Sequence, residues 1–255
     1  MKRMLLCLMP LALLVAGCPD KDHKSKVDEL MSAAQMPSED PVPKPREKTK
    51  WEKMPSITID NLGAYIGGER AHLEDKKKGL TELKDIVSRL PIGDEPVAVI
   101  AQKKTRASWV ALVVFELGEG GAKEILLKTP GRDDLGGEIT VVPEKTLDNI
   151  PGCSISVAVN AELNTGVWAY KGGLGQKHVK GFAGPDLSNT AESIKKRMKT
   201  CNSPIAFFGG SFEREWQHVY NLGALLRKVD EKNQIEKLVL LADEPVAGRK
   251  VKLRK

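Results

Sequence analysis

Apolar and polar residues follow two different periods along this chain, and the two periods predict a mixture of helices and strands. Between residues 80 and 90, apolar side chains recur at helical spacing, and Pro91 ends the pattern. Short apolar runs bounded by turn residues, such as PVAVIAQ at 96–102 and PIAFFGG at 204–210, are typical of buried strands. The pattern predicts a fold of the α/β (α+β) class.

From residue 56 onward the predicted elements occur in an order that is repeated. The first set is a hairpin (56–70), a helix (80–90), a strand (96–102), a helix (106–117) and two strands (123–129 and 138–143). The second set is a hairpin (154–172), a helix (186–199), a strand (204–210), a helix (213–229) and two strands (236–242 and 248–254).

The two sets align without a gap around their second helices, where Trp109 falls opposite Trp216. An internal repeat of this kind predicts two tandem domains, at 56–143 and 154–255. Because crossover connections are right-handed, each domain is expected to be a two-layer sandwich. In each, a mixed sheet carries two helices on one face, in the order ββαβαβ.

The start of the chain has the order of an export signal. Two basic residues precede an uncharged apolar run at 4–16, which is shorter than the roughly 20 residues that a spanning helix needs. We therefore expect residues 1–17 to be removed. Residues 18–55 are charged and proline-rich, which predicts a flexible tether because such a sequence buries little apolar surface.

The residues Val15-Ala16-Gly17-Cys18 resemble the lipobox of bacterial lipoproteins. That resemblance implies a lipoprotein in which Cys18 becomes the first residue and carries the acyl chains, such as palmitate, of a membrane anchor. It places the chain on the periplasmic side of a bacterial membrane. Pro19 after the cysteine favours the outer membrane, by analogy with lipoprotein sorting. The alternative is an ordinary secretory signal with an incidental cysteine.

Two cysteines remain beyond the leader, Cys153 and Cys201. In a compartment that permits oxidation they are a candidate disulfide, with two buried free thiols as the alternative.

Charge and composition exclude several classes of function. The formal net charge is +6, and the basic residues alternate with acidic ones through most of the chain. This pattern is typical of a solvated surface and argues against nucleic-acid binding. The denser runs at 76–78 and 248–255 are interpreted as a charged helix start and a charged strand end. The histidines are scattered without zinc-ligand spacing, and no nucleophile, phosphate-loop or paired-cysteine motif is present. No catalytic residue, metal site or cofactor is predicted, and we do not expect an enzyme.

The segment 97–129 resembles the periplasmic domain of the biopolymer-transport proteins ExbD and TolR. The resemblance is carried by the strand before Gln102, by Trp109 and Val113 in the helix, and by Gly121 before the next strand. It implies a periplasmic fold that docks onto partners, pairs with itself or contacts peptidoglycan. The chain departs from the family at Gln102 and Gly209, where the family has an acidic residue, and in lacking a spanning helix that bears an aspartate.

These observations favour a lipid-anchored periplasmic interaction module, accessory to an energised transport system of the ExbD/TolR type. The expected partners are the membrane, through Cys18, and an envelope protein, with the two domains packing as an internal pseudo-dimer. Trp109 and Trp216 are the candidate partner-contact aromatics, and core or interface packing is their alternative role. The alternative function is a peptidoglycan-binding or envelope-linking lipoprotein, and an enzyme with a carboxylate site ranks third.

Overall fold

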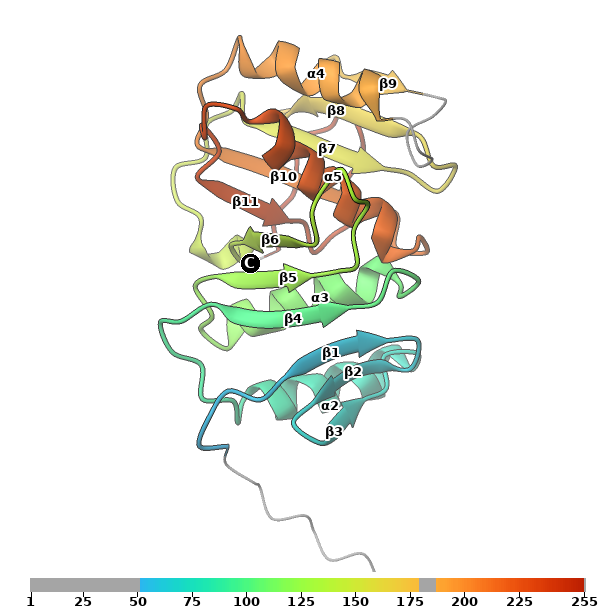
Figure 1. The fold of residues 1–255 in the computed structure, drawn as a ribbon, viewed down its shortest axis with the longest axis vertical. Coiled ribbons are helices and arrows are strands. Elements are labelled where there is room, and N and C mark those ends of the chain that lie inside the picture. Colours follow the sequence, from blue (N-terminus) through green and yellow to red (C-terminus); the bar gives the residue numbers. More distant parts are fainter. Residues whose placement is uncertain (1–50, 179–186, 255) are drawn as a thin grey trace, which may run out of the picture. The chain divides into compact units, whose positions relative to one another are not determined.

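The computed structural model describes residues 51–178 and 187–254. The expected signal, Cys18 and most of the tether lie outside these described residues. The described part belongs to one compact unit that contains two mixed sheets and four α-helices (Figure 1). The mixed α/β class predicted from the sequence is confirmed. Among the described helices, none combines the length and apolar content needed to cross a membrane.

The first sheet has six strands and two helices. Along the chain these elements are β1 (Ile57–Asp60), β2 (Gly63–Ile66), β3 (Glu69–Ala71), α2 (Lys76–Val87), β4 (Val97–Ala101), α3 (Ala107–Glu119), β5 (Ile125–Lys128) and β6 (Glu138–Val141). The strand order is β3-β2-β1-β4-β5-β6. Strands β1, β4 and β5 are parallel, and the outer strands pair antiparallel. A short 3₁₀ helix, η1 (Glu144–Thr146), follows β6.

The second sheet has five strands. Its elements are β7 (Ile155–Val159), β8 (Thr165–Ala169), β9 (Gln176–His178), α4 (Ser188–Met198), β10 (Ile205–Gly210), α5 (Trp216–Val229) and β11 (Lys237–Leu240). The order is β11-β10-β7-β8-β9, with β7, β10 and β11 parallel. The two sheets share the order and directions of five strands, β3-β2-β1-β4-β5 in the first and β9-β8-β7-β10-β11 in the second, whereas β6 has no counterpart in the second sheet. Their division into two separate domains remains a prediction.

Local sequence explains why these elements form where they do. In β1 the apolar Ile57 and Ile59 are fully buried and alternate with partly exposed polar residues, which is the period of a strand with one covered face. Asp75 is the N-cap of helix α2, and its carboxylate accepts hydrogen bonds from the backbone N–H groups of Lys77 and Lys78. The start of α2 lies beside the start of α3, since residues from both helix starts line one cavity.

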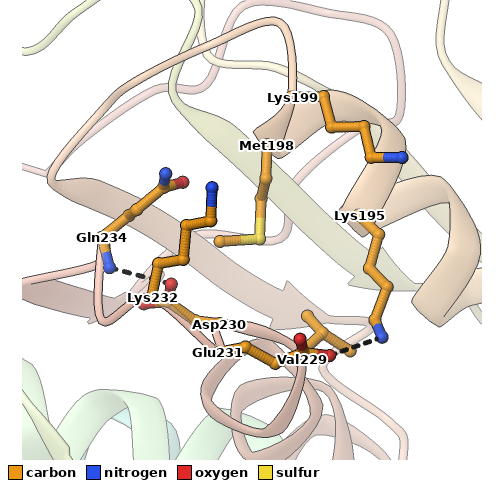
Figure 2. A pocket seen from close by; sticks show the side chains of 8 residues that line it. All are labelled: Lys195, Met198, Lys199, Val229, Asp230, Glu231, Lys232 and Gln234. Atoms are coloured by element: carbon orange, nitrogen blue, oxygen red, sulfur yellow. Dashed lines mark hydrogen bonds and ion pairs between the residues drawn. The ribbon is translucent and has the colours of Figure 1, made fainter.

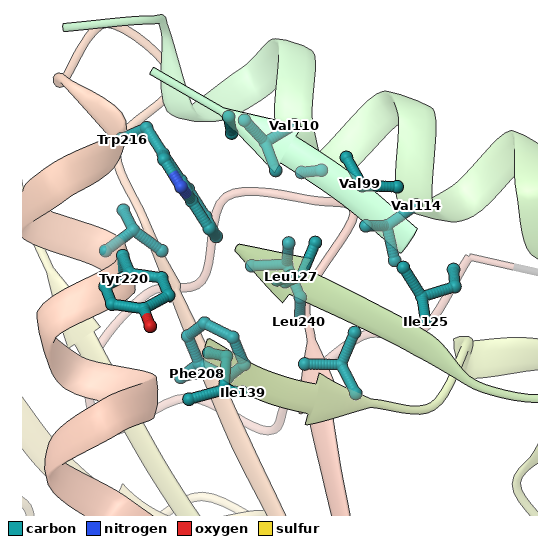
Figure 3. Packing of buried hydrophobic residues seen from close by; sticks show 14 of the residues in the cluster. Val99, Val110, Val114, Ile125, Leu127, Ile139, Phe208, Trp216, Tyr220 and Leu240 are labelled. Carbon is teal, nitrogen blue, oxygen red and sulfur yellow. The ribbon is translucent and has the colours of Figure 1, made fainter. Parts of the chain in front are cut away.

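One continuous hydrophobic core joins the two halves. It contains Leu127 of β5 and Ile139 of β6 together with Phe208 of β10 and Tyr220 of α5, and Figure 3 shows these side chains converging from both halves. Val142, directly after β6, donates its backbone N–H to the carbonyl of Leu238 in β11 at 2.9 Å. The inner edges of the two sheets therefore meet.

The outer faces of the two sheets differ. On the second sheet, a smaller cluster covers the face opposite the helices, where Trp168 and Phe207 are buried against Val142 and Val251 from the segments after β6 and β11. On the first sheet, Tyr65 and Ile100 are both 43% exposed. Their strand registers correspond to those of Trp168 and Phe207. Within residues 51–178 and 187–254, one outer face is thus covered and the other is open.

Two details of the predicted element order are wrong. The hairpin predicted at 56–70 is a three-stranded antiparallel unit, because Gly67 and Gly68 adopt positive φ and divide the expected second strand into β2 and β3; the hairpin predicted at 154–172 is confirmed as β7 and β8. The expected closing strand at 248–254 is irregular. Its Val251 N–H donates to the carbonyl of Tyr170, but the segment crosses the sheet face as a covering strap and does not pair along it.

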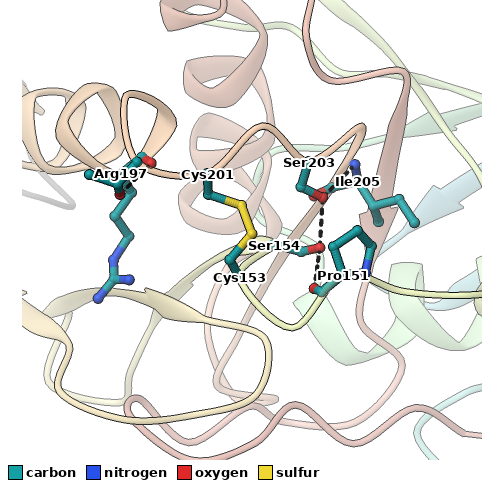
Figure 4. The surroundings of a disulfide bond; sticks show 8 residues. Pro151, Cys153, Ser154, Arg197, Cys201, Ser203 and Ile205 are labelled. Atoms are coloured by element: carbon teal, nitrogen blue, oxygen red, sulfur yellow. Dashed lines mark hydrogen bonds between the residues drawn. A yellow bond between two sulfur atoms is a disulfide. The ribbon is translucent and has the colours of Figure 1, made fainter.

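Cys153 and Cys201 form the predicted disulfide, with their Cα atoms 5.8 Å apart. Figure 4 shows the bond beside a short hydrogen-bonded chain in which the hydroxyls of Ser154 and Ser203 lie 2.7 Å apart. Ser154 also donates to the carbonyl of Pro151. The bond and these contacts tie the loop before β7 to the loop before β10.

Candidate functional site

The two halves meet at corresponding loops, one between β4 and α3 and the other between β10 and α5. The backbone N–H of Ala107 donates to the carbonyl of Arg214 at 2.8 Å, and that of Trp216 donates to the carbonyl of Thr105 at 2.6 Å. Arg106 and Glu215 lie opposite each other in an antiparallel bridge. The pairing brings the first turns of α3 and α5 together and leaves a groove beside α3.

We call this depression the junction groove. Its deeper part has a volume of about 250 Å³ and lies between the starts of α2 and α3, the β10–α5 loop and the end of the chain. The apolar lining comes from both halves. It consists of Leu73, Leu80, Trp109, Leu112, Phe212 and Ala242. This lining can hold an apolar group away from water.

Cations dominate the rim of this deeper part. Lys76, Arg106 and Arg254 line it, against a single acidic residue, Glu74. Arg254 is already neutralised by Asp243, with a nitrogen-to-oxygen distance of 2.6 Å. The guanidinium of Arg106 instead lies over the ring of Trp109, 5.2 Å from its centroid. Across residues 51–178 and 187–254, neither Lys76 nor Arg106 is in an ion pair.

The helix dipoles do not explain these two cations. Lys76 is the first residue of α2, and Arg106 directly precedes α3. The amino end of a helix carries partial positive charge, which disfavours a cation there by about 0.3–1 kcal/mol. Their positive charges therefore gain nothing from the helix dipoles at the mouth of the apolar groove.

A second cavity of about 640 Å³ continues the junction groove. It shares Lys76, Arg106, Ser108 and Phe212 with the deeper part, so the two are contiguous. Its other lining residues include Glu213 and Glu244. Lys76 and Arg106 thus line both parts of the groove, and the larger part adds two carboxylates.

A buried carboxylate fixes the wall that the chain end contributes. Glu144 accepts hydrogen bonds from the backbone N–H groups of Ala242 at 2.7 Å and Arg254 at 2.6 Å, and both of these residues line the groove. Burial raises the pKa of Glu144, and the two backbone donors offset part of that effect. Glu144 is thus a positioning residue for the groove.

A different cavity, of about 220 Å³, lies between the ends of α4 and α5 (Figure 2). Part of its charge has structural roles, because Lys195 pairs with Glu231 at 2.9 Å and the Asp230 carboxylate accepts the backbone N–H groups of Gln234 and Ile235. Lys199 and Lys232 have no ion pair among the described residues. The apolar lining of this cavity is limited to Met198 and Val229 and includes no aromatic side chain, so it is less suited than the junction groove to hold an apolar group.

The structure separates the two predicted contact aromatics. Trp109 is 6% exposed and lines the junction groove. Trp216 is 0% exposed and donates its indole N–H to the hydroxyl of Thr129 at 2.7 Å, so it contacts the other half of its own chain and offers no surface to an external partner. Lipidation at Cys18 lies outside the described residues and stays a prediction.

Sequence reasoning missed most of the groove. Lys76 was interpreted as part of a charged helix start, and Arg106, Phe212 and Arg254 were not singled out. The available signal was the run of lysines at 76–78, which is unusual at a helix start. Within the described part of the chain, no cluster of three or more potential metal ligands occurs.

Comparisons of the chain with protein-family models, with curated protein sequences and with solved structures gave no match. The resemblance to ExbD and TolR therefore remains a hypothesis drawn from the sequence pattern.

Proposed function

We propose that this chain is a lipid-anchored periplasmic interaction module, and that its junction groove binds a partner protein of the cell envelope. The observation that carries the proposal is the groove itself. Both halves build its apolar lining, and the unpaired cations Lys76 and Arg106 stand at its rim. Apolar pockets with a few polar groups at the edge are typical binding sites.

The predicted anchor gives this binding a location. Acyl chains on Cys18 hold a folded domain at a membrane surface, since each buried methylene contributes about 0.8 kcal/mol. Of the predicted tether at 18–55, Trp51 and Met54 pack against the core, and the stretch before them would let the groove reach partners away from that surface. The role as an accessory to an energised transport system rests on the resemblance to ExbD and TolR.

Site-specific photo-crosslinking tests the proposal. The full-length protein, expressed in its native envelope, carries a photoreactive amino acid in place of Leu112 in the groove. A matched control carries it in place of Ala98, which is exposed on the open face of the first sheet. We expect Leu112 to capture a partner that Ala98 does not capture. Capture from both positions alike, or from neither, would contradict the proposal.

The same experiment separates the alternative function. A peptidoglycan-binding lipoprotein would sediment with purified cell-wall sacculi, and its groove position would yield no cross-linked protein. A Cys18→Ser variant checks the anchor, because it should move from the membrane fraction to the soluble fraction while the groove still captures its partner from an added envelope extract.

A further inference from the structure

The charges and the apolar lining of the junction groove indicate the chemistry of the ligand that it binds. We propose that the groove binds an extended peptide segment of that partner in which an acidic residue directly adjoins an apolar side chain. This inference rests on the proposed function, and it adds the chemistry of the ligand.

The apolar requirement follows from the deeper part of the groove. Ligand pockets that enclose a whole drug-sized molecule have volumes of roughly 300–1,000 Å³. The deeper part holds about 250 Å³ and is walled by Trp109, Leu112 and Phe212, so it suits one apolar side chain and not a whole molecule. Aromatic walls of this kind bind apolar side chains strongly.

The acidic requirement follows from Lys76 and Arg106. Both are exposed, stand at the rim of the apolar part and have no acidic partner among the described residues. A carboxylate next to the buried side chain would accept charge-assisted hydrogen bonds from them, and such bonds are the stronger kind. The face of Trp109 keeps the Arg106 guanidinium over the groove.

The requirement for an extended segment follows from the adjoining cavity. It continues from Ser108 and Phe212 for about 640 Å³, which is space for further residues of the same ligand. Glu213 and Glu244 line it, and Glu244 already accepts the backbone N–H of Phe212 at 3.3 Å. Lys76 and Arg106 line this cavity as well, so its two cations balance its two carboxylates and set no charge requirement on the further residues of the ligand.

Binding of defined peptides tests the inference. The protein is the chain from residue 18 onward with Cys18→Ser. The probe is fluorescein-labelled Glu-Phe-Gly-Lys-amide. Two comparison peptides replace its Glu by Gln or its Phe by Gly. Fluorescence anisotropy measures affinity. We expect each comparison peptide to bind about tenfold more weakly, which corresponds to about 1.4 kcal/mol, and we expect added salt to weaken binding of the Glu peptide alone.

Protein variants assign the effect to the groove. Arg106→Gln and Lys76→Gln should each weaken binding of the Glu peptide by about tenfold and leave the Gln peptide unchanged. Lys104→Gln is the matched control, because Lys104 is an exposed cation of the same loop that does not line the groove. Equal binding of the Glu and Gln peptides, equal losses in all three variants, or no binding of any peptide would overturn the inference.

The two proposals can fail separately. If the groove position captures an envelope protein while none of the peptides binds, the proposed function stands and the ligand chemistry is wrong. If the peptides bind as expected and no envelope protein is captured, the groove recognises acidic and apolar peptides, but the proposed envelope partner is wrong.

Discussion

Trp109 and Trp216 occupy corresponding positions at the starts of α3 and α5, yet their surroundings differ. The indole of Trp216 is fully enclosed, with Thr129 as its hydrogen-bond acceptor and Tyr220 edge-on at 5.9 Å. Trp109 has Arg106 over its ring and forms a groove wall. The same residue type therefore holds the halves together at one site and lines the junction groove at the other.

A buried acidic residue on α3 leads to a prediction about the effect of a single side chain on stability. Glu116 is 4% exposed, and its nearest cation, Lys84, is 3.9 Å away. Burial raises the pKa of Glu116, with only partial compensation from Lys84. A raised pKa in the folded state means that this group favours folding below its ordinary value of about 4.3 and opposes folding as the pH rises through the raised pKa.

Glu116→Gln should therefore stabilise the protein increasingly as the pH rises from about 4 to 8, because the variant has no carboxylate to ionise in the core. Urea unfolding of both proteins across this range measures the difference in unfolding free energy. The control is Glu95→Gln, where the acid is exposed and has no ion pair among the described residues; Glu119 is unsuitable because its charge also raises the pKa of Glu116. A difference that is constant with pH, or equal in both variants, would show that burial of Glu116 is not the cause.

At the scale of elements, the helices and central strands were predictable because their apolar periods decide them. The turn at Gly67 and Gly68 was not, since a glycine pair also occurs within strands and only the observed positive φ values define a turn there. The tail at 248–254 has a strand's alternation, with Val251 buried, but it covers a sheet face instead of pairing. Alternation of apolar and polar residues predicts that one face of a segment is buried, but it does not predict which backbone groups the segment pairs with.

Helix α2 provides a prediction about its first residue. Lys76→Glu should increase the unfolding free energy by about 0.3–1 kcal/mol, because an acid complements the amino end of a helix. It should also abolish binding of the acidic peptide. Thermal unfolding and fluorescence anisotropy measure the two effects. Lys252→Glu is the comparison, since Lys252 is exposed and lies outside any helix. A loss of stability in Lys76→Glu would mean that Lys76 has a structural role.

At the scale of the whole molecule, the junction groove could not be predicted from the sequence. Phe212 and Arg254 are more than a hundred residues from Lys76 and Arg106 in the sequence, and the pairing of the two loops brings Phe212 to the same cavity. Arg254 arrives because Glu144 holds its backbone. Sequence periods predict which face of an element is buried, but they do not say which elements from distant parts of the chain share a cavity.

The disulfide stabilises the whole folded chain by restricting its unfolded state. Cys153 and Cys201 are 48 residues apart, so their bond closes a long loop and restricts the unfolded ensemble by up to about 4 kcal/mol in the chain-entropy model. The double variant Cys153→Ala, Cys201→Ala should lose a comparable free energy of unfolding. Urea unfolding under non-reducing conditions measures it. Wild-type protein under reducing conditions is the control and should behave like the variant.

The meeting of β6 and β11 also determines how this protein avoids aggregation. Strand edges that are left unpaired act as templates for other chains. Here the inner edge of each sheet is shielded by the other half, and the free outer edges in the described part of the chain are β3 and β9, which have three residues each. On β3, Arg70 pairs with Asp60, and Glu69 pairs with Arg89. Separating the halves would therefore expose two longer edges that the intact chain keeps out of reach.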